Sequence, residues 1–221
     1  MLEMSKMFEK NLKKNIKKLE EIPKGDEYDE VSIPLYNHKN FLVKKLFLDR
    51  FFAAYKMADF KNKVVLDYGC GSGLFLQSLS SEIKNGIGLD LNISVAKKIV
   101  DSSKINVVEI TEQTNIEKFS NVDIITSFDV LEHVNDLEKI AKSFYNILND
   151  NGILVVSGPT ENLFYKIARQ VAKIMINGNL KGGEEHVTNI INIRNEIEKN
   201  GFKITQFKNL FGLFHIIKFE K

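Results

Sequence analysis

The sequence predicts an α/β protein whose mostly parallel sheet ends in an antiparallel hairpin, and three observations lead to that prediction. Short apolar runs alternate with segments of helical periodicity from about residue 62 to residue 200. The runs are apolar on both faces, which is typical of parallel strands that helices cover on both sides. The last two runs, at 202–208 and 211–220, lie too close together for a crossover connection, so these strands must be antiparallel. We therefore expect seven strands with helices on both faces.

Two helices are expected ahead of the sheet. Apolar residues recur about every 3.6 positions in residues 1–21, as in an amphipathic helix. Prolines and a glycine then interrupt the pattern, and a second helical pattern covers residues 37–57. We predict that residues 1–61 form a helical lid over the ligand site and that residues 62–221 form the main domain. The apolar positions of the first helix are Phe8, Leu12, Ile16 and Leu19.

The elements of the main domain follow in a regular order. Asn135 or Asp136 is the expected N-cap of the helix before the fifth strand, and the "NDNG" segment at 149–152 is expected to end that helix. Gly201 is expected to stop the last helix. The predicted parallel strands cover residues 63–68, 86–91, 106–110, 122–128 and 153–157, and the predicted helices cover 73–83, 93–103, 137–148 and 188–200.

Composition excludes several classes of protein. The 31 basic residues nearly balance the 29 acidic ones, so the net charge of +2 gives no broad basic surface and we expect no nucleic-acid partner. The single cysteine, Cys70, excludes an intramolecular disulfide and a cysteine-based zinc cluster, and no metal site is predicted. No signal-peptide pattern and no apolar run of 18 residues is present, so we expect a cytoplasmic protein.

A glycine-rich segment, "VLDYGCGSG", follows the first predicted strand. Its glycines are Gly69, Gly71 and Gly73, and Asp67 precedes them. Glycines at such a turn permit positive φ and allow a ligand to approach the backbone closely. Ligands of open parallel sheets bind at the carboxyl ends of the strands, where this loop must lie. The segment is therefore the predicted ligand site.

The spacing of the glycines indicates the kind of ligand. A dinucleotide loop of the form G-x-G-x-x-G would require a glycine where this chain has Leu74. Asp67 would repel a pyrophosphate and attract an ammonium group. Asp90 ends the second predicted strand and can accept hydrogen bonds from ribose hydroxyls. These features favour a cationic nucleoside that carries an amino acid. Two alternatives remain open: a nicotinamide-dependent oxidoreductase and a non-catalytic nucleoside-binding protein.

Four segments in order carry a resemblance to a known family. The segments "VLDYGCGSG", "GIGLD", "VDIITSFDVLEHV" and "NGILVVSGP" resemble the motifs of class I S-adenosylmethionine-dependent methyltransferases, in particular the small-molecule branch with the "LEHV" signature. The resemblance covers about residues 62–160. It implies a Rossmann-like seven-stranded sheet with a C-terminal antiparallel hairpin, and S-adenosylmethionine as the methyl donor.

The resemblance also implies roles for residues of the glycine loop and the second strand. Asp67 and the loop from Gly69 to Gly73 would hold the methionine part of the cofactor. Asp90 would bind the ribose hydroxyls, and Leu91 would lie against the adenine.

Further roles follow for the third and fourth strands. Ser127 and Phe128, at the end of the fourth strand, would border the sulfonium. The family often has an aspartate after the third strand that contacts the adenine amine. Here that position falls in "EITEQ", where Thr111 or Glu112 would take its place.

Methyl transfer from a sulfonium depends mainly on orienting the acceptor, so a general base is required only for an acceptor that must lose a proton. The candidate bases are His133 in "DVLEHV" and His186 in "GGEEHV", with Asp129 and His38 less favoured. A structural role in its own loop is the alternative for His133 and for Asp129, and a solvated or loop-stabilising role is the alternative for His186. No catalytic residue is assigned on this basis.

The acceptor is expected to be a small or lipid-like molecule methylated at O, N or C. Residues 160–183 predict a helix that Thr160 caps, with one apolar face and a basic face opposite. Such a helix packs on its own domain, surrounds an apolar acceptor or lies on a membrane surface. Peripheral membrane contact is therefore a hypothesis for this segment.

Overall fold

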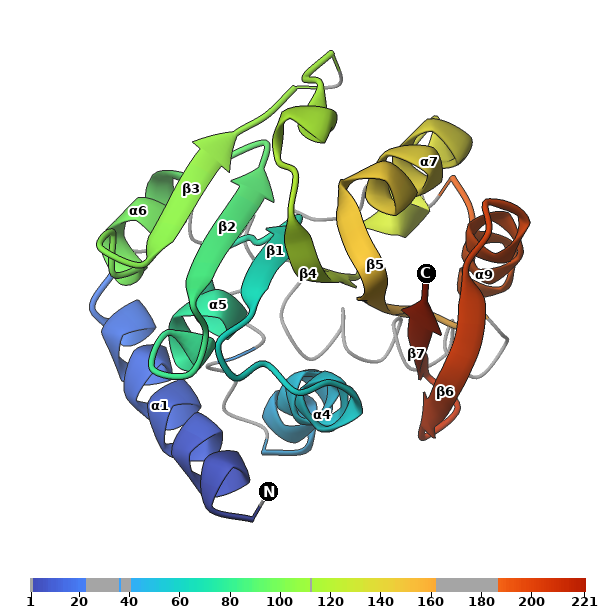
Figure 1. The fold of residues 1–221 in the computed structure, drawn as a ribbon. Helices are drawn as coiled ribbons and strands as arrows, with labels where there is room; N and C mark the ends of the chain where they lie inside the picture. Colours follow the sequence, from blue (N-terminus) through green and yellow to red (C-terminus); the bar gives the residue numbers. More distant parts are fainter. Residues whose placement is uncertain (1, 23–35, 37–40, 112, 162–186) are drawn as a thin grey trace.

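The core of the protein is one seven-stranded sheet (Figure 1), in a computed structural model that describes residues 2–22, 36, 41–111, 113–161 and 187–221. The strands are β1 (Val64–Tyr68), β2 (Asn85–Asp90), β3 (Ile105–Glu109), β4 (Val122–Phe128), β5 (Leu148–Pro159), β6 (Lys203–Leu210) and β7 (Phe214–Glu220). Their order across the sheet is β3-β2-β1-β4-β5-β7-β6. The pairs among β1 to β5 are parallel, and β7 is antiparallel to both β5 and β6. The predicted fold class is confirmed.

Helices cover both faces of this sheet. The described helices are α1 (Leu2–Glu20), α4 (Phe41–Met57), α5 (Leu74–Leu79), α6 (Ser94–Ile99), α7 (Leu137–Ile147) and α9 (Ile190–Lys199), with the short 3-10 helices η1 (Ile116–Lys118) and η2 (Leu131–His133). Side chains of α1, α4, α5 and α6 share one core with Val155 of β5, whereas α7, α9 and η1 share another with Leu154 and Val156. Successive β5 residues thus point to opposite faces, as a strand requires.

The two N-terminal helices are part of the first of these cores. The four predicted apolar positions of α1 are buried. The ring of Phe8 stacks on Tyr55 of α4 at a centroid distance of 4.3 Å and meets Phe75 of α5 edge-on at 5.7 Å. The predicted helical region is present in the described residues, and its role as a lid stays a prediction. None of the helices in the described ranges is long and apolar enough to cross a membrane.

Two helices are shorter than their periodicity predicts. α5 ends at Leu79 instead of residue 83, and α6 ends at Ile99 instead of residue 103. Beyond α6, the carboxylate of Asp101 accepts hydrogen bonds from the backbone N–H and the hydroxyl of Ser103. Short polar side chains of this kind compete with helical hydrogen bonds, and a count of apolar positions does not register that competition.

The "NDNG" segment does not form the helix end that the sequence predicts. α7 ends at Ile147, and β5 already begins at Leu148, which pairs with Val122 of β4. Regular pairing resumes only at Ile153 opposite Ile124, so residues 149–152 form an irregularity inside the strand pair. The side-chain amide of Asn149 donates to the Asp123 carboxylate of β4 at 3.1 Å and ties this irregularity to the sheet.

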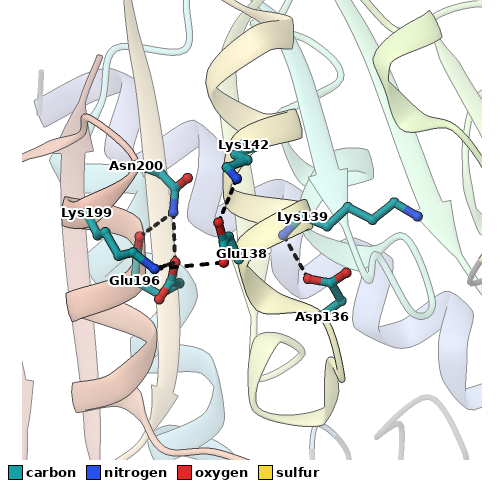
Figure 2. A network of polar contacts seen from close by, with 7 residues as sticks. All are labelled: Asp136, Glu138, Lys139, Lys142, Glu196, Lys199 and Asn200. Carbon is teal, nitrogen blue, oxygen red and sulfur yellow. Dashed lines mark hydrogen bonds and ion pairs between the residues drawn. The ribbon is translucent and has the colours of Figure 1, made fainter.

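Polar side chains link the outer surfaces of α7 and α9 (Figure 2). Asp136, and not Asn135, caps α7, because its carboxylate accepts a hydrogen bond from the backbone N–H of Lys139 at 3.0 Å. Glu138 pairs with Lys142 within α7 at 2.6 Å and with Lys199 of α9 at 3.8 Å. Exposed pairs of this kind contribute about 1 kcal/mol or less. The buried apolar side chains beneath them therefore dominate the packing of these helices.

Candidate active site

The glycine loop connects β1 to α5 at the carboxyl end of β1. Gly69, Gly71 and Gly73 have φ values of 75°, 53° and 71°, in the left-handed region that favours glycine. The N–H groups of Gly69 and Cys70 donate to the carbonyl of Leu89 in β2 at 2.7 and 3.0 Å. The loop that the sequence predicts is therefore present and is bonded to the neighbouring strand.

Gly69 has a second reason to be glycine. A Cβ atom at this position would lie 2.1 Å from Cγ2 of Val130, which belongs to the loop after β4. Carbon atoms pack at about 3.5–4.0 Å, so no side chain fits between the two loops. The loop after β4 thus packs directly on the glycine loop.

Asp90 at the end of β2 contacts the same glycine loop. Its Oδ2 accepts a hydrogen bond from the N–H of Gly71 at 2.6 Å, and its Oδ1 accepts one from the N–H of Asn92 at 3.1 Å. A carboxylate offers about four acceptor positions, so these bonds leave room for a hydroxyl of a ligand. The next residue, Leu91, is 68% exposed and presents an apolar surface beside the carboxylate.

Asp67 lies below the loop, inside β1. It is 2% exposed, and its Oδ1 accepts a hydrogen bond of 2.6 Å from the hydroxyl of Thr126 in β4. Burial raises the pKa of Asp67 to about 7, the Thr126 hydrogen bond opposes that rise, and the charge of Asp90 adds to it. A cationic group of a ligand would favour the ionised carboxylate. Thr126 was not among the residues predicted for the site, although a polar residue within the apolar strand β4 is a detectable signal.

The predicted residues of β3 and β4 occupy two different environments. The hydroxyl of Ser127 is fully buried and has no hydrogen-bond partner in the part of the chain that the structure describes. The ring of Phe128 packs edge-on against Phe51 and Phe75, with centroids 5.1 and 4.8 Å away. Thr111, just after β3, is exposed, and its N–H donates to the Thr114 hydroxyl at 2.9 Å.

Of the proposed bases, His133 and Asp129 fall within the described residues. His133 is half-buried at the end of η2, and its neighbour Glu132 is 1% exposed. Burial raises the pKa of Glu132 to about 7, while the positive charge of Arg50 lowers it and the charge of Glu161 raises it. His186 and His38 lie outside the described residues, as do Glu112 and most of the predicted helix at 160–183.

Asp129 forms an ion pair that the sequence did not reveal. Its carboxylate pairs with the guanidinium of Arg50 from α4 and accepts a hydrogen bond of 3.0 Å from the hydroxyl of Ser157 in β5. The guanidinium lies 4.4 Å from the ring centroid of Phe47 and 4.7 Å from that of Phe214. The sequence feature that indicates this ion pair is a lone arginine in the apolar stretch "LFLDRFFAAY".

The predicted cofactor residues therefore lie on neighbouring strands. The order β3-β2-β1-β4 brings Thr111, Asp90, Asp67 and Ser127 to the carboxyl ends of adjacent parallel strands. In a sheet of this type a ligand binds at that edge.

The comparisons with known proteins agree with this arrangement. Residues 36–206 match a family model described as a methyltransferase domain, and the chain belongs to that family. Its fold resembles a SAM dependent methyltransferase from Aquifex aeolicus, with a TM-score of 0.64 and 13% identity over 89% of this chain and 99% of that one. It also resembles the magnesium protoporphyrin IX methyltransferase from Synechocystis PCC 6803 with bound SAH, with a TM-score of 0.63 and 15% identity over 89% and 93% of the two chains.

Curated relatives match a shorter part of the chain. A ubiquinone biosynthesis O-methyltransferase from Glaesserella parasuis is 35% identical over 108 residues, which are 43% of this chain and 44% of the relative. A carboxy-S-adenosyl-L-methionine synthase from Staphylococcus epidermidis is 32% identical over 139 residues, 59% of this chain and 57% of the relative. The chain thus spans about half the length of these relatives. The chain thus belongs to the methyltransferase-domain family and has the fold of the S-adenosylmethionine-dependent methyltransferases that it resembles, and the nicotinamide-dependent alternative finds no support in that membership.

Proposed function

We propose that this protein binds S-adenosylmethionine at the glycine loop and transfers the methyl group to a small or lipid-like acceptor. The observation that carries the proposal is the grouping of the loop, Asp90 and Leu91 at one edge of the sheet. The carboxylate of Asp90 offers acceptor positions for ribose hydroxyls, and the exposed Leu91 offers an apolar surface for the adenine.

The remaining residues of the site would act by binding and orienting. When bound, the cofactor supplies an activated methyl group on a positively charged sulfur. Asp67 would pair with the ammonium of the methionine part and become ionised as it does so. The buried hydroxyl of Ser127 and the end of β4 would border the reacting centre. Orientation of the acceptor accounts for several kcal/mol of such a barrier.

A hydroxyl is the acceptor group that we favour. The support is the similarity of the chain to ubiquinone biosynthesis O-methyltransferases over about two fifths of its length. A hydroxyl must lose its proton during transfer, so a base is required. His133 remains a proposed base, and the buried Glu132 beside it is a second one, because a pKa near 7 suits proton transfer at neutral pH. His186 stays a third candidate.

Titration calorimetry tests the cofactor assignment. We expect S-adenosylmethionine and S-adenosylhomocysteine to bind, and NAD not to bind. Asp90→Asn should weaken S-adenosylhomocysteine binding about 10-fold or more, because a lost charge-assisted hydrogen bond is worth about 1.5–3 kcal/mol. Asp150→Asn, an exposed change in the "NDNG" irregularity, is the matched control and should leave the affinity unchanged. Binding of NAD alone would overturn the assignment.

A metabolite screen with methyl-labelled cofactor tests the transfer itself. We expect the label to appear in a hydroxyl-bearing small molecule. Because one relative is a carboxy-S-adenosyl-L-methionine synthase, mass spectrometry should analyse the nucleoside as well as the acceptor. A modified nucleoside with no labelled acceptor would contradict methyl transfer and leave cofactor binding in place.

Membrane contact through residues 160–183 is a separate proposal from the sequence, supported by the helical spacing of apolar and basic residues in that stretch of the sequence. Co-sedimentation with anionic vesicles tests it. Absence of binding would remove the membrane role and would not affect the cofactor site.

A further inference from the structure

We propose that Arg50 is a positioning residue for the glycine loop, which it reaches through Asp129 and Val130. The inference rests on the proposed function, because the glycine loop is taken as the cofactor site. It gives α4 a specific part in cofactor binding that the predicted lid did not include.

The first step is the attachment of Arg50 itself. The residue is 2% exposed, and its Nε donates to the backbone carbonyl of Phe47 at 3.4 Å. The guanidinium lies near the rings of Phe47 in α4 and Phe214 in β7, at 4.4 and 4.7 Å from their centroids. Rings within about 6 Å attract a cation, so the side chain has one preferred position.

The second step is the conformation of Asp129. This residue has a φ of 55°, which non-glycine residues rarely adopt and which costs about 1–3 kcal/mol unless surrounding contacts stabilise it. Those contacts are present: the carboxylate pairs with Arg50 and accepts from the Ser157 hydroxyl, and the backbone N–H donates to the Ser157 carbonyl at 3.0 Å. Arg50 therefore helps to keep the backbone in this conformation.

The third step leads from Asp129 to the cofactor loop. The conformation of Asp129 directs the next residue, Val130, whose methyl groups lie where a Cβ of Gly69 would be. The N–H of Gly69 donates to Leu89, and the N–H of Gly71 donates to Asp90. A change at Asp129 would thus alter the packing behind a loop whose amides already bond to β2 and its carboxyl end.

The charge of Arg50 supports a role beyond stability. Apolar residues in place of a buried ion pair are often as stable or more stable, so stability alone does not call for such a pair here. Burial raises the pKa of the Tyr36 hydroxyl, and the charge of Arg50 opposes that rise. Burial also raises the pKa of Glu132, and the charge of Arg50 again opposes it. Arg50 is therefore close enough to act on two polar groups besides Asp129.

Two readouts test the inference: hydrogen exchange of the ligand-free protein and calorimetric binding of S-adenosylhomocysteine. Two variants change the arginine: Arg50→Lys keeps the positive charge without the planar guanidinium, and Arg50→Met removes the charge. The third variant is Asp129→Asn, because asparagine tolerates a positive φ. Lys45→Met is the control, because it removes an exposed ion pair with Asp49 from the same helix.

We expect both Arg50 variants to exchange the amides of residues 69–73 and 129–134 at least 10-fold faster, with β3 unchanged, and to bind S-adenosylhomocysteine at least 10-fold more weakly. Asp129→Asn should change both readouts in the same direction, and Lys45→Met should change neither. If Arg50→Met does not fold, the exchange and affinity of Arg50→Lys test the inference by the same criteria. If neither Arg50 variant folds, the exchange and affinity of Asp129→Asn test it.

Two results would overturn the inference. One is exchange and affinity at the wild-type level in the folded variants. The other is a uniform rise in exchange that includes β3, which would make Arg50 a stabilising residue only. If the wild-type protein bound no S-adenosylhomocysteine, the proposed function would fail, while the exchange readout would still decide whether Arg50 positions the loop.

Discussion

A methyl group added at Gly69 has no room in this structure, which makes Gly69→Ala a sharp test of how the two loops pack. The new Cβ would lie 2.1 Å from Cγ2 and 2.7 Å from Cγ1 of Val130. Because carbon atoms pack at about 3.5–4.0 Å, one of the loops must move by roughly 1.5 Å. Overpacking of this kind typically costs about 1–3 kcal/mol.

The backbone adds a second penalty. Gly69 has a φ of 75°, and a residue with a Cβ atom loses roughly 1–2 kcal/mol in the left-handed region. The two terms together predict a loss of about 2–5 kcal/mol in the free energy of unfolding. Domains of this kind have about 5–15 kcal/mol in total, so the change is large. Urea unfolding measures it, and calorimetry with S-adenosylhomocysteine should show weaker binding.

Two further variants separate the two penalties. Gly86→Ala in β2 is the control. Its Cβ would meet the ends of the Ile105, Ile83 and Leu76 side chains, at 3.1, 3.2 and 3.4 Å, and its φ is not positive, so we expect a loss of about 1 kcal/mol or less. Adding Val130→Ala to Gly69→Ala should recover part of the stability lost to overpacking, because it removes both methyl groups and keeps only the Val130 Cβ atom at 2.9 Å. The backbone penalty should remain. A Gly69→Ala protein within about 0.5 kcal/mol of wild type would refute the reasoning, as would a double variant with no recovery.

Three further predictions concern Asp67, Leu91 and Phe8. Because the folded pKa of Asp67 is raised from 3.8 to about 7, the folded state binds the proton more tightly, and the free energy of unfolding should fall as the pH rises from about 4 to about 7. Asp67→Asn should remove its share of that fall, at most about 4 kcal/mol, in urea unfolding across this range, and an unchanged slope would contradict the shift. Leu91→Ala should change the free energy of unfolding by less than about 0.5 kcal/mol, because the side chain is 68% exposed. It should nevertheless weaken S-adenosylhomocysteine binding about 5-fold, for about 1 kcal/mol of lost apolar contact, and an unchanged Kd would remove the adenine role. Phe8→Ala should lower the free energy of unfolding by about 3–5 kcal/mol, since the ring is fully buried against Tyr55. A loss below about 1 kcal/mol in the same assay would mean that α1 is a separable lid.

Local patterns predicted much of the fold. The strand β4 lies where the sequence placed it, and β1, β2 and β3 differ from their predicted bounds by a residue or so. These strands are short apolar runs, and burial on both faces of a sheet demands such runs whatever the neighbours are. The glycine loop was equally predictable, because positive φ at three alternate residues requires glycine within the loop itself.

The order of the last strands was not predictable in this way. The proximity of 202–208 to 211–220 implies an antiparallel pair, but either member can lie next to β5. The structure places β7 between β5 and β6. The burial of the two strands explains the choice, since most of β6 is exposed whereas β7 carries Ile216, Ile217 and Phe219 into the cores on both faces.

The fold class and the place of the glycine loop could be predicted from the sequence, because each depends on residues that are neighbours in the chain. What packs behind that loop depends on tertiary contacts. Arg50 in α4, Asp129 after β4 and Gly69 after β1 are far apart in sequence, and no periodicity relates them. They meet because helix packing brings α4 against the end of β4, so an arginine that is simply one residue of a helix in the sequence becomes a buried partner of the loop that packs on the glycine loop.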